Sequence, residues 1–250
     1  MITVSHIQIP ALPTERPRRL YVYLPEDYDA TERRYPVLYM FDGHNVFYDS
    51  DATYGKSWGM KEYLEAHHTP LIVVAVECNP EGFRRLNEYS PWSFHAPRPV
   101  GTVEGLGKVT MDWIVHELKP QIDRQYRTLS EREHTMIAGS SMGGLMTLYA
   151  VTAYNETFSK GAALSPCFWV SPKNMAELLK TPLAEPTMVY MDYGGAEDDG
   201  DIRPHAAMFR AAAALSKAGA SVAARTVPGA QHSEAYWEQR IPVFMDYLLG

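Results

Sequence analysis

The segment Leu71–Val76 reads LIVVAV, six consecutive apolar residues without a polar side chain to face water. A strand that is apolar on both faces belongs inside a sheet that is covered on both sides. Several other short apolar runs share this character, and amphipathic stretches of helical length lie between them. This alternation predicts βαβ units, and therefore an α/β fold with a mostly parallel central sheet and helices on both faces.

Seven strands and five helices are predicted along the chain. The strands are Arg19–Leu24, Val37–Phe41, Leu71–Glu77, Thr135–Gly139, Gly161–Leu164, Met188–Asp192 and Ala220–Val227. The helices are Gly59–His67, Gly107–Tyr126, Met142–Tyr154, His205–Ala218 and Glu234–Leu249. Pro120 predicts a kink or an early end in the second helix. Because the first strands lie close together, we expect them to form an antiparallel edge at the N-terminal side of the sheet.

The segment Glu81–Val103 is rich in proline, arginine and aromatic residues and shows no clear periodicity. We expect it to form a long ordered loop. Such loops in compact domains are often functional.

The size and charge of the chain restrict its function. Its 250 residues suit one large α/β domain over 1–250. The formal net charge of −7 argues against binding to nucleic acid or to an anionic membrane, since both require a basic face. No apolar stretch reaches bilayer length and the N-terminus shows no secretory signal, so we expect a cytoplasmic protein. Cys78 and Cys167 form no metal-ligand pattern and are expected to be buried free thiols.

The pentapeptide Gly139-Ser140-Ser141-Met142-Gly143 matches the pattern G-x-S-x-G, with a strand-like run before it and a helix-forming run after it. A nucleophilic serine must sit on a strained turn with its hydroxyl in the open. Glycines two residues before and after it remove the side chains that would collide there. We therefore predict Ser141 as a nucleophile, and the amide of Met142 at the following helix N-terminus as an oxyanion donor. The alternative is a tight turn without chemistry.

A serine hydroxyl needs a neighbouring base at neutral pH, and in α/β-hydrolases the chain order is serine, acid, histidine. Only His205 and His232 follow Ser141. His205 opens a predicted amphipathic helix, where surface and capping roles are common. His232 lies in a loop after a predicted strand, at the edge of the sheet where functional groups gather. We therefore favour His232 as the base.

The acid is expected just beyond the strand that ends near Tyr193, in the segment GGAEDDGD. Glu197 is our first candidate and Asp198 the alternative, while Asp192 falls inside the predicted strand. Such an acid orients the imidazole and stabilises its protonated form. An acidic surface loop or a cation-binding loop is the competing interpretation of this segment.

Six segments of the chain resemble, in the same order, the family named "Putative esterase", the esterase D or enterochelin-esterase-like group of α/β-hydrolases. They are YPVLYMFDGHNVF (35–47), RLNEYSPW (85–92), HELKPQIDRQYRT (116–128), AGSSMGGL (138–145), ALSPCFW (163–169) and GAQHSEAYWEQRIPVFMDYL (229–248). Together they extend over nearly the whole chain. The resemblance implies a serine esterase with the α/β-hydrolase fold.

The resemblance also implies roles for individual residues. The amide of His44, which follows the Asp42-Gly43 pair, would be the second oxyanion donor. Glu197, three residues after Gly194, would be the acid of the triad. Asp42 itself has the alternative role of hydrogen-bonding the amides of its own loop.

Three further residues are candidates for the substrate pocket. Arg85 is one, although a structural ion pair with Glu88 that holds the loop is the favoured alternative. Trp92 and Trp169 are the others, with packing roles equally expected for both.

The sequence thus predicts hydrolysis of a small-molecule carboxylic ester through an acyl-enzyme intermediate, without a metal or organic cofactor. The alternatives are acyl transfer to an alcohol or sugar, thioester hydrolysis as in S-formylglutathione hydrolase, and a non-catalytic carbohydrate- or partner-binding protein. The acyl and alcohol groups are not predicted, because the fold and triad determine the reaction type while the pocket determines the substrate.

Overall fold

Eight strands form the central sheet, in the order β1-β2-β4-β3-β7-β8-β9-β10. The computed structural model describes all residues 1–250. The strands are β1 (Ile2–Ile7), β2 (Arg18–Tyr23), β3 (Val37–Met40), β4 (Ile72–Val76), β7 (Thr135–Ser140), β8 (Lys160–Leu164), β9 (Met188–Gly194) and β10 (Ser221–Val227). The β1–β2 and β2–β4 pairs are antiparallel and the other neighbours run parallel. The predicted α/β fold with an antiparallel N-terminal edge is confirmed.

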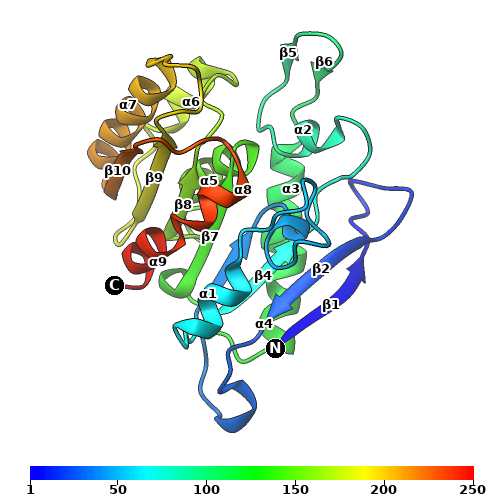
Figure 1. Ribbon diagram of the computed structural model, residues 1–250. Helices are drawn as coiled ribbons and strands as arrows, with labels where there is room; N and C mark the ends of the chain where they lie inside the picture. Colours follow the sequence, from blue (N-terminus) through cyan, green and yellow to red (C-terminus); the bar gives the residue numbers. More distant parts are fainter.

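Helices cover both faces of this sheet (Figure 1). One face carries α3 (Gly107–Trp113), α4 (Lys119–Gln125), α5 (Met142–Ala153) and α7 (Arg203–Ala218), and the other carries α1 (Met60–Ala66) and α9 (Ile241–Leu249). None of the helices combines the length and the apolar composition that crossing a bilayer requires.

The strands divide their side chains between two hydrophobic cores, one on each face. In β3, Val37 and Tyr39 belong to the first core, whereas Leu38 and Met40 belong to the second. This alternation is the period of two that a strand imposes. It explains why strands covered on both faces read as continuous apolar runs.

The predicted elements are incomplete where the local pattern is weak. Strand β1 was not predicted, because its residues are mostly exposed at the edge of the sheet and show no apolar run. The segment Glu81–Val103, expected to be a loop, contains helix α2 (Arg84–Glu88) and the hairpin of β5 (Phe94–Ala96) and β6 (Gly101–Val103). This hairpin projects at the top of the molecule in Figure 1. Helix α6 (Pro172–Leu178) was also not predicted.

Two predicted helices are interrupted. Between α3 and α4 the chain passes through a π-helical turn at Ile114–Leu118. Pro120 has no N–H to bond the carbonyl of His116, so the turn before it widens while the helix continues. The last predicted helix is two helices, α8 (Glu234–Glu238) and α9, with Pro242 in the first turn of the second.

Candidate active site

Ser141 lies at the sharp turn between β7 and α5, with φ 59° and ψ −120°. A residue with a side chain rarely adopts a positive φ, so this backbone is strained and needs room. Glycines provide that room, since a Cβ added to Gly139 would lie 2.8 Å from the carbonyl carbon of Gly143. The glycines of the motif thus allow the strand and the helix to meet closely around the serine.

The Ser141 hydroxyl lies 3.5 Å from Sγ of Cys167. Cys167 is a buried free thiol, as predicted, and burial raises its pKa, so this neighbour is neutral. Ser141 lines the same cavity as His232, but its hydroxyl is hydrogen-bonded to the thiol and not to the imidazole.

His232 follows β10 and Glu197 follows β9, two parallel strands whose register pairs Val227 with Gly194. The two loops therefore start side by side, and Nδ1 of His232 lies 2.8 Å from Oε2 of Glu197. The side chain of His232 is 40% exposed, whereas that of Glu197 is 1% exposed. The pair thus joins a buried carboxylate to an imidazole that reaches solvent.

Glu197 is held in place by several donors. Its Oε1 accepts from the Ser165 hydroxyl at 2.6 Å, from the Gly194 amide at 2.7 Å and from Arg240 at 3.4 Å. Burial by itself raises the pKa of Glu197, but the hydrogen bonds from His232 and Ser165 outweigh burial and the pKa is lowered. Glu197 is therefore an ionised acceptor that is oriented toward the imidazole.

The neighbouring acids lie elsewhere. Asp198 is exposed, and Glu197 instead is the acid that contacts His232. Asp192 lies within β9, as predicted, and forms a buried ion pair with Arg240 at 2.8 Å. Burial raises the pKa of Asp192 even with this partner.

A short helix at Gly43–Asn45 follows β3, and Asp42, the residue before it, contacts the first turn of α5. A Cβ added to Gly143 in that turn would lie 3.5 Å from a carboxylate oxygen of Asp42. The backbone amides of His44 and Met142 donate to no other group in the protein. The two predicted oxyanion donors are therefore unpaired amides in the first turns of two helices.

Asp42 is paired with Arg85 of α2. Nε and Nη2 of Arg85 donate to the two carboxylate oxygens at 2.6 and 2.7 Å. Burial by itself raises the pKa of Asp42, but Arg85 outweighs burial and the pKa is lowered. The predicted ion pair between Arg85 and Glu88 is wrong. Glu88 points into the protein, where the guanidinium of Arg18 on β2 binds both of its oxygens at 2.6 Å.

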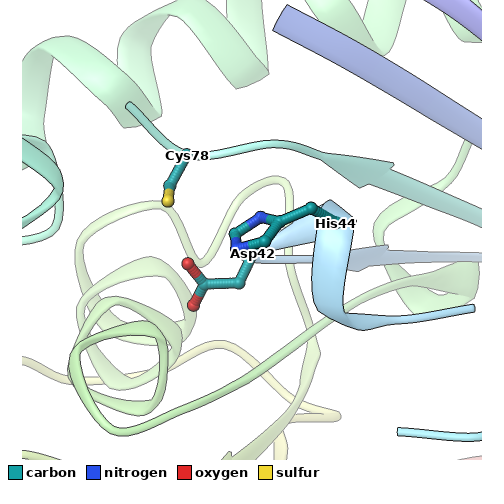
Figure 2. Close-up of side chains that lie close together, drawn as sticks. All are labelled: Asp42, His44 and Cys78. Atoms are coloured by element: carbon teal, nitrogen blue, oxygen red, sulfur yellow. The ribbon is translucent and has the colours of Figure 1, made fainter. Parts of the chain in front are cut away.

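Beside this pair, the side chains of Asp42, His44 and Cys78 come close together (Figure 2). One oxygen, nitrogen or sulfur atom of each lies within 4.8 Å of the others, and such atoms are zinc ligands in many proteins. Arg85 already balances the charge of Asp42, and burial raises the pKa of the Cys78 thiol well above its usual range. Nδ1 of His44 is buried without a hydrogen-bond partner. One unpartnered nitrogen beside a neutral thiol and a neutralised carboxylate does not fit a metal site.

A cavity of about 720 Å³ lies over Ser141 and is bordered by the Gly43–Asn45 helix and the His232 loop. Only five of its 20 lining residues are hydrophobic, so the cavity is polar. Arg85 and Glu234 are among the lining residues.

The two predicted pocket tryptophans do not line this cavity. Trp92 packs edge-on against Tyr149, with ring centroids 6.1 Å apart. Trp169 is 58% exposed and packs edge-on against Phe94 of the projecting hairpin. The structure therefore brings Arg85, but neither tryptophan, to the cavity over Ser141.

The residues that hold Glu197 were missed from the sequence. Besides donating to Glu197, the Ser165 hydroxyl accepts from Nε1 of Trp237 and from Nη1 of Arg240, each at 3.1 Å. Arg240 could have been identified from the sequence, because a charged residue beside the apolar run of the last helix needs a buried partner. Ser165 could not have been identified, since a serine in that loop is expected to be an ordinary turn residue.

The chain matches the family model described as "Putative esterase" over residues 12–246. It is 26% identical to the Bacillus subtilis protein YbbA over 183 residues, which cover 72% of this chain and 69% of YbbA. An IroE-like serine hydrolase from Shewanella oneidensis has a TM-score of 0.79 at 20% identity, covering 99% of this chain and 79% of that one. The siderophore hydrolase EstA from Aspergillus nidulans has a TM-score of 0.71 at 16% identity, covering 98% of this chain and 94% of that one. The two solved structures share the fold of this chain.

Proposed function

The chain belongs to this esterase family and is a carboxylic ester hydrolase, and we propose that Ser141, His232 and Glu197 form its catalytic triad. The observation that carries the proposal is the 2.8 Å contact between His232 and Glu197 beside the cavity that Ser141 lines. A buried, ionised carboxylate on Nδ1 selects the tautomer in which Nε2 accepts a proton.

In the proposed reaction, Oγ of Ser141 attacks the ester carbonyl carbon while Nε2 of His232 takes its proton. Glu197 stabilises the imidazolium that forms. The unpaired amides of His44 and Met142 donate to the oxyanion of the tetrahedral intermediate. His232 then protonates the leaving alcohol oxygen as the carbon–oxygen bond breaks, which leaves the acyl group on Ser141.

Water completes the cycle. His232 accepts a proton from a water molecule that attacks the acyl carbonyl, and the acid product leaves as the proton returns to Ser141. The mechanism requires the Ser141 hydroxyl to exchange its contact with Cys167 for one with His232 when substrate binds. Catalytic hydrogen bonds often tighten only in the substrate complex.

Ser141→Ala tests the nucleophile directly, with Ser140→Ala as the matched control one residue away. We expect Ser141→Ala to lose nearly all hydrolysis of p-nitrophenyl acetate and all labelling by a fluorophosphonate, while the melting temperature stays near that of the wild type. Labelling should persist in Ser140→Ala, because Ser140 is a buried strand residue. Labelling of Ser141→Ala, or wild-type turnover by it, would refute the assignment.

The base is tested in the same way by the two histidines that follow Ser141. His232→Ala should lose hydrolysis by about 10³-fold or more. His205→Ala should not, because His205 lies on α7 with Nδ1 near the hydroxyl of Thr226 and outside the cavity. Equal losses in both variants would reject His232 as the base.

Acyl transfer is the competing function of the same site. An acyl-enzyme that reacts with an alcohol gives a new ester in place of the acid. Adding an alcohol acceptor and measuring the partition of products separates the two, and we expect mainly the acid. A p-nitrophenyl ester chain-length series beside methyl ferulate, acetylated sugars and a siderophore ester defines the acyl and alcohol groups.

A further inference from the structure

Four carboxylates line the cavity over Ser141, together with only two arginines. Three of the carboxylates are ion-paired. The pairs are Asp42–Arg85 at 2.6 Å, Asp51–Arg19 at 3.0 Å and Glu77–Arg19 at 2.9 Å. The fourth carboxylate, Glu234, forms no ion pair, although His232 and Arg85 act on it from a greater distance, so the excess negative charge of the cavity wall lies there.

Glu234 is nearly buried, with 6% of its surface exposed. Its side-chain contact is with Nδ2 of Asn45, which donates to Oε1 at 3.1 Å. Burial raises the pKa of Glu234. A hydrogen bond from its own amide and the charges of His232 and Arg85 act in the opposite direction but do not outweigh burial. A carboxylate taken out of water without a cation is unfavourable, and a cation from outside the protein would relieve that cost.

Aromatic side chains border the same cavity. Trp237 lines it from α8, the helix that begins at Glu234. Tyr54 and Phe83 also line it and are 83% and 49% exposed. Aromatic faces attract ammonium groups, most strongly where water is excluded.

We propose that Glu234 forms a subsite for an ammonium group carried by the ester substrate. An ammonium group meets both features, the unpaired carboxylate and the aromatic border. A neutral hydroxyl would leave the charge of Glu234 unbalanced and would gain little from the aromatic faces. The proposal rests on the esterase function proposed above, and it adds a substrate class to it.

Two alcohols of the same shape test the subsite, namely choline and its uncharged isostere 3,3-dimethylbutan-1-ol. Each is measured as a competitive inhibitor of p-nitrophenyl acetate hydrolysis, and by calorimetric binding to Ser141→Ala. We expect choline to bind about tenfold more tightly than the isostere, which corresponds to about 1.4 kcal/mol. Glu234→Gln, which keeps the oxygen that accepts from Asn45, should bring this ratio most of the way to one, because only the weaker attraction of the aromatic faces remains.

Asp51→Asn is the control, since it removes the same charge from the same cavity at a carboxylate that is already paired with Arg19. It should keep most of the preference for choline. Equal binding of the two alcohols by the wild type, an unchanged ratio in Glu234→Gln, or the same loss in both variants would overturn the subsite. If none of the esters in the substrate series is hydrolysed, the esterase mechanism fails, while the calorimetric ratios still decide for or against the subsite.

Discussion

Two buried arginines, one on β2 and one at the start of α9, hold carboxylates in different ways. On β2, Arg18 binds both oxygens of Glu88, and the two side chains are 3% and 2% exposed. At the start of α9, Arg240 pairs with Asp192 of β9 and also approaches Glu197, whose second oxygen accepts from the half-exposed His232. The first assembly is closed, because both of its charged groups are buried. The second is open, because it links a buried guanidinium, through Glu197, to an imidazole that can exchange protons with solvent.

The two assemblies differ in what they control. Breaking a closed buried pair leaves one charge without a partner, so the effect falls on stability. In the open assembly, a change at Glu197 leaves Arg240 with Asp192, so the effect falls on His232.

Glu197→Gln should lower kcat/KM for ester hydrolysis by about 10³-fold or more. The amide no longer stabilises the imidazolium, and its NH₂ group can present a donor to Nδ1 and so favour the wrong tautomer. Steady-state kinetics with p-nitrophenyl acetate measure the loss, and thermal unfolding should show a melting temperature near that of the wild type. A loss of less than tenfold would mean that the open assembly has no catalytic role.

Glu88→Gln should reverse this pattern. It leaves the guanidinium of Arg18 buried beside a neutral amide, which should lower the free energy of unfolding by about 3 kcal/mol or more. Urea unfolding measures the change, and kcat per folded molecule should stay close to the wild-type value. A variant as stable as the wild type would show that the closed pair contributes little.

The pH dependence of the free energy of unfolding should depend on Glu77. This carboxylate forms ion pairs with Arg16 and Arg19 and is intermediate between the closed and the open assembly. Burial by itself raises the pKa of Glu77, but hydrogen bonds from Arg16 and Arg19 lower it from 4.5 to about 2. Since the folded pKa is depressed, Glu77 stabilises the fold above pH 4.5, and this contribution is lost as the pH falls toward 2. Arg16 is 50% exposed, so solvent screens part of the interaction.

Glu77→Gln should therefore be less stable than the wild type at pH 7, and the difference should shrink by about 1 to 2 kcal/mol at pH 3. Urea unfolding of both proteins at pH 7, 4.5 and 3 measures it. A difference that stays constant or grows with acidification contradicts the direction of the shift.

How far the sequence predicts this molecule depends on whether the signal is local. The buried strands and the turn at Ser141 depend on runs of a few residues, so both could be predicted. The partner of Arg85 could not, because the choice between Asp42 and Glu88 depends on which strands lie beside α2. The acid that contacts His232 is an intermediate case. The sequence predicts that it lies in a short acidic run, but it does not determine which residue of that run it is.

A tertiary contact determines which acid faces His232. A Cβ added to Gly194 would lie 2.3 Å from the carbonyl oxygen of Ala230 and 2.5 Å from Oε1 of Glu197, so only a glycine allows the two loops to pack with Glu197 between them. The next residue, Asp198, is left exposed. Sequence spacing alone does not predict the approach of Ala230, which lies in the loop after β10, far along the chain.

Asp198→Asn should give the smallest effect, a change in kcat/KM of less than about twofold, as expected for an exposed substitution away from the chemistry. The double variant Glu197→Gln with Asp198→Asn sharpens the test. If Asp198 partly replaced Glu197 as the acid, the double variant would be much slower than Glu197→Gln alone, whereas we expect equal rates from the two. Equal rates mean that Asp198 cannot reach the imidazole while the packing at Gly194 holds the loop, so the position of the acid is determined by the contact between the β9 and β10 loops and not by the number of acids in the segment.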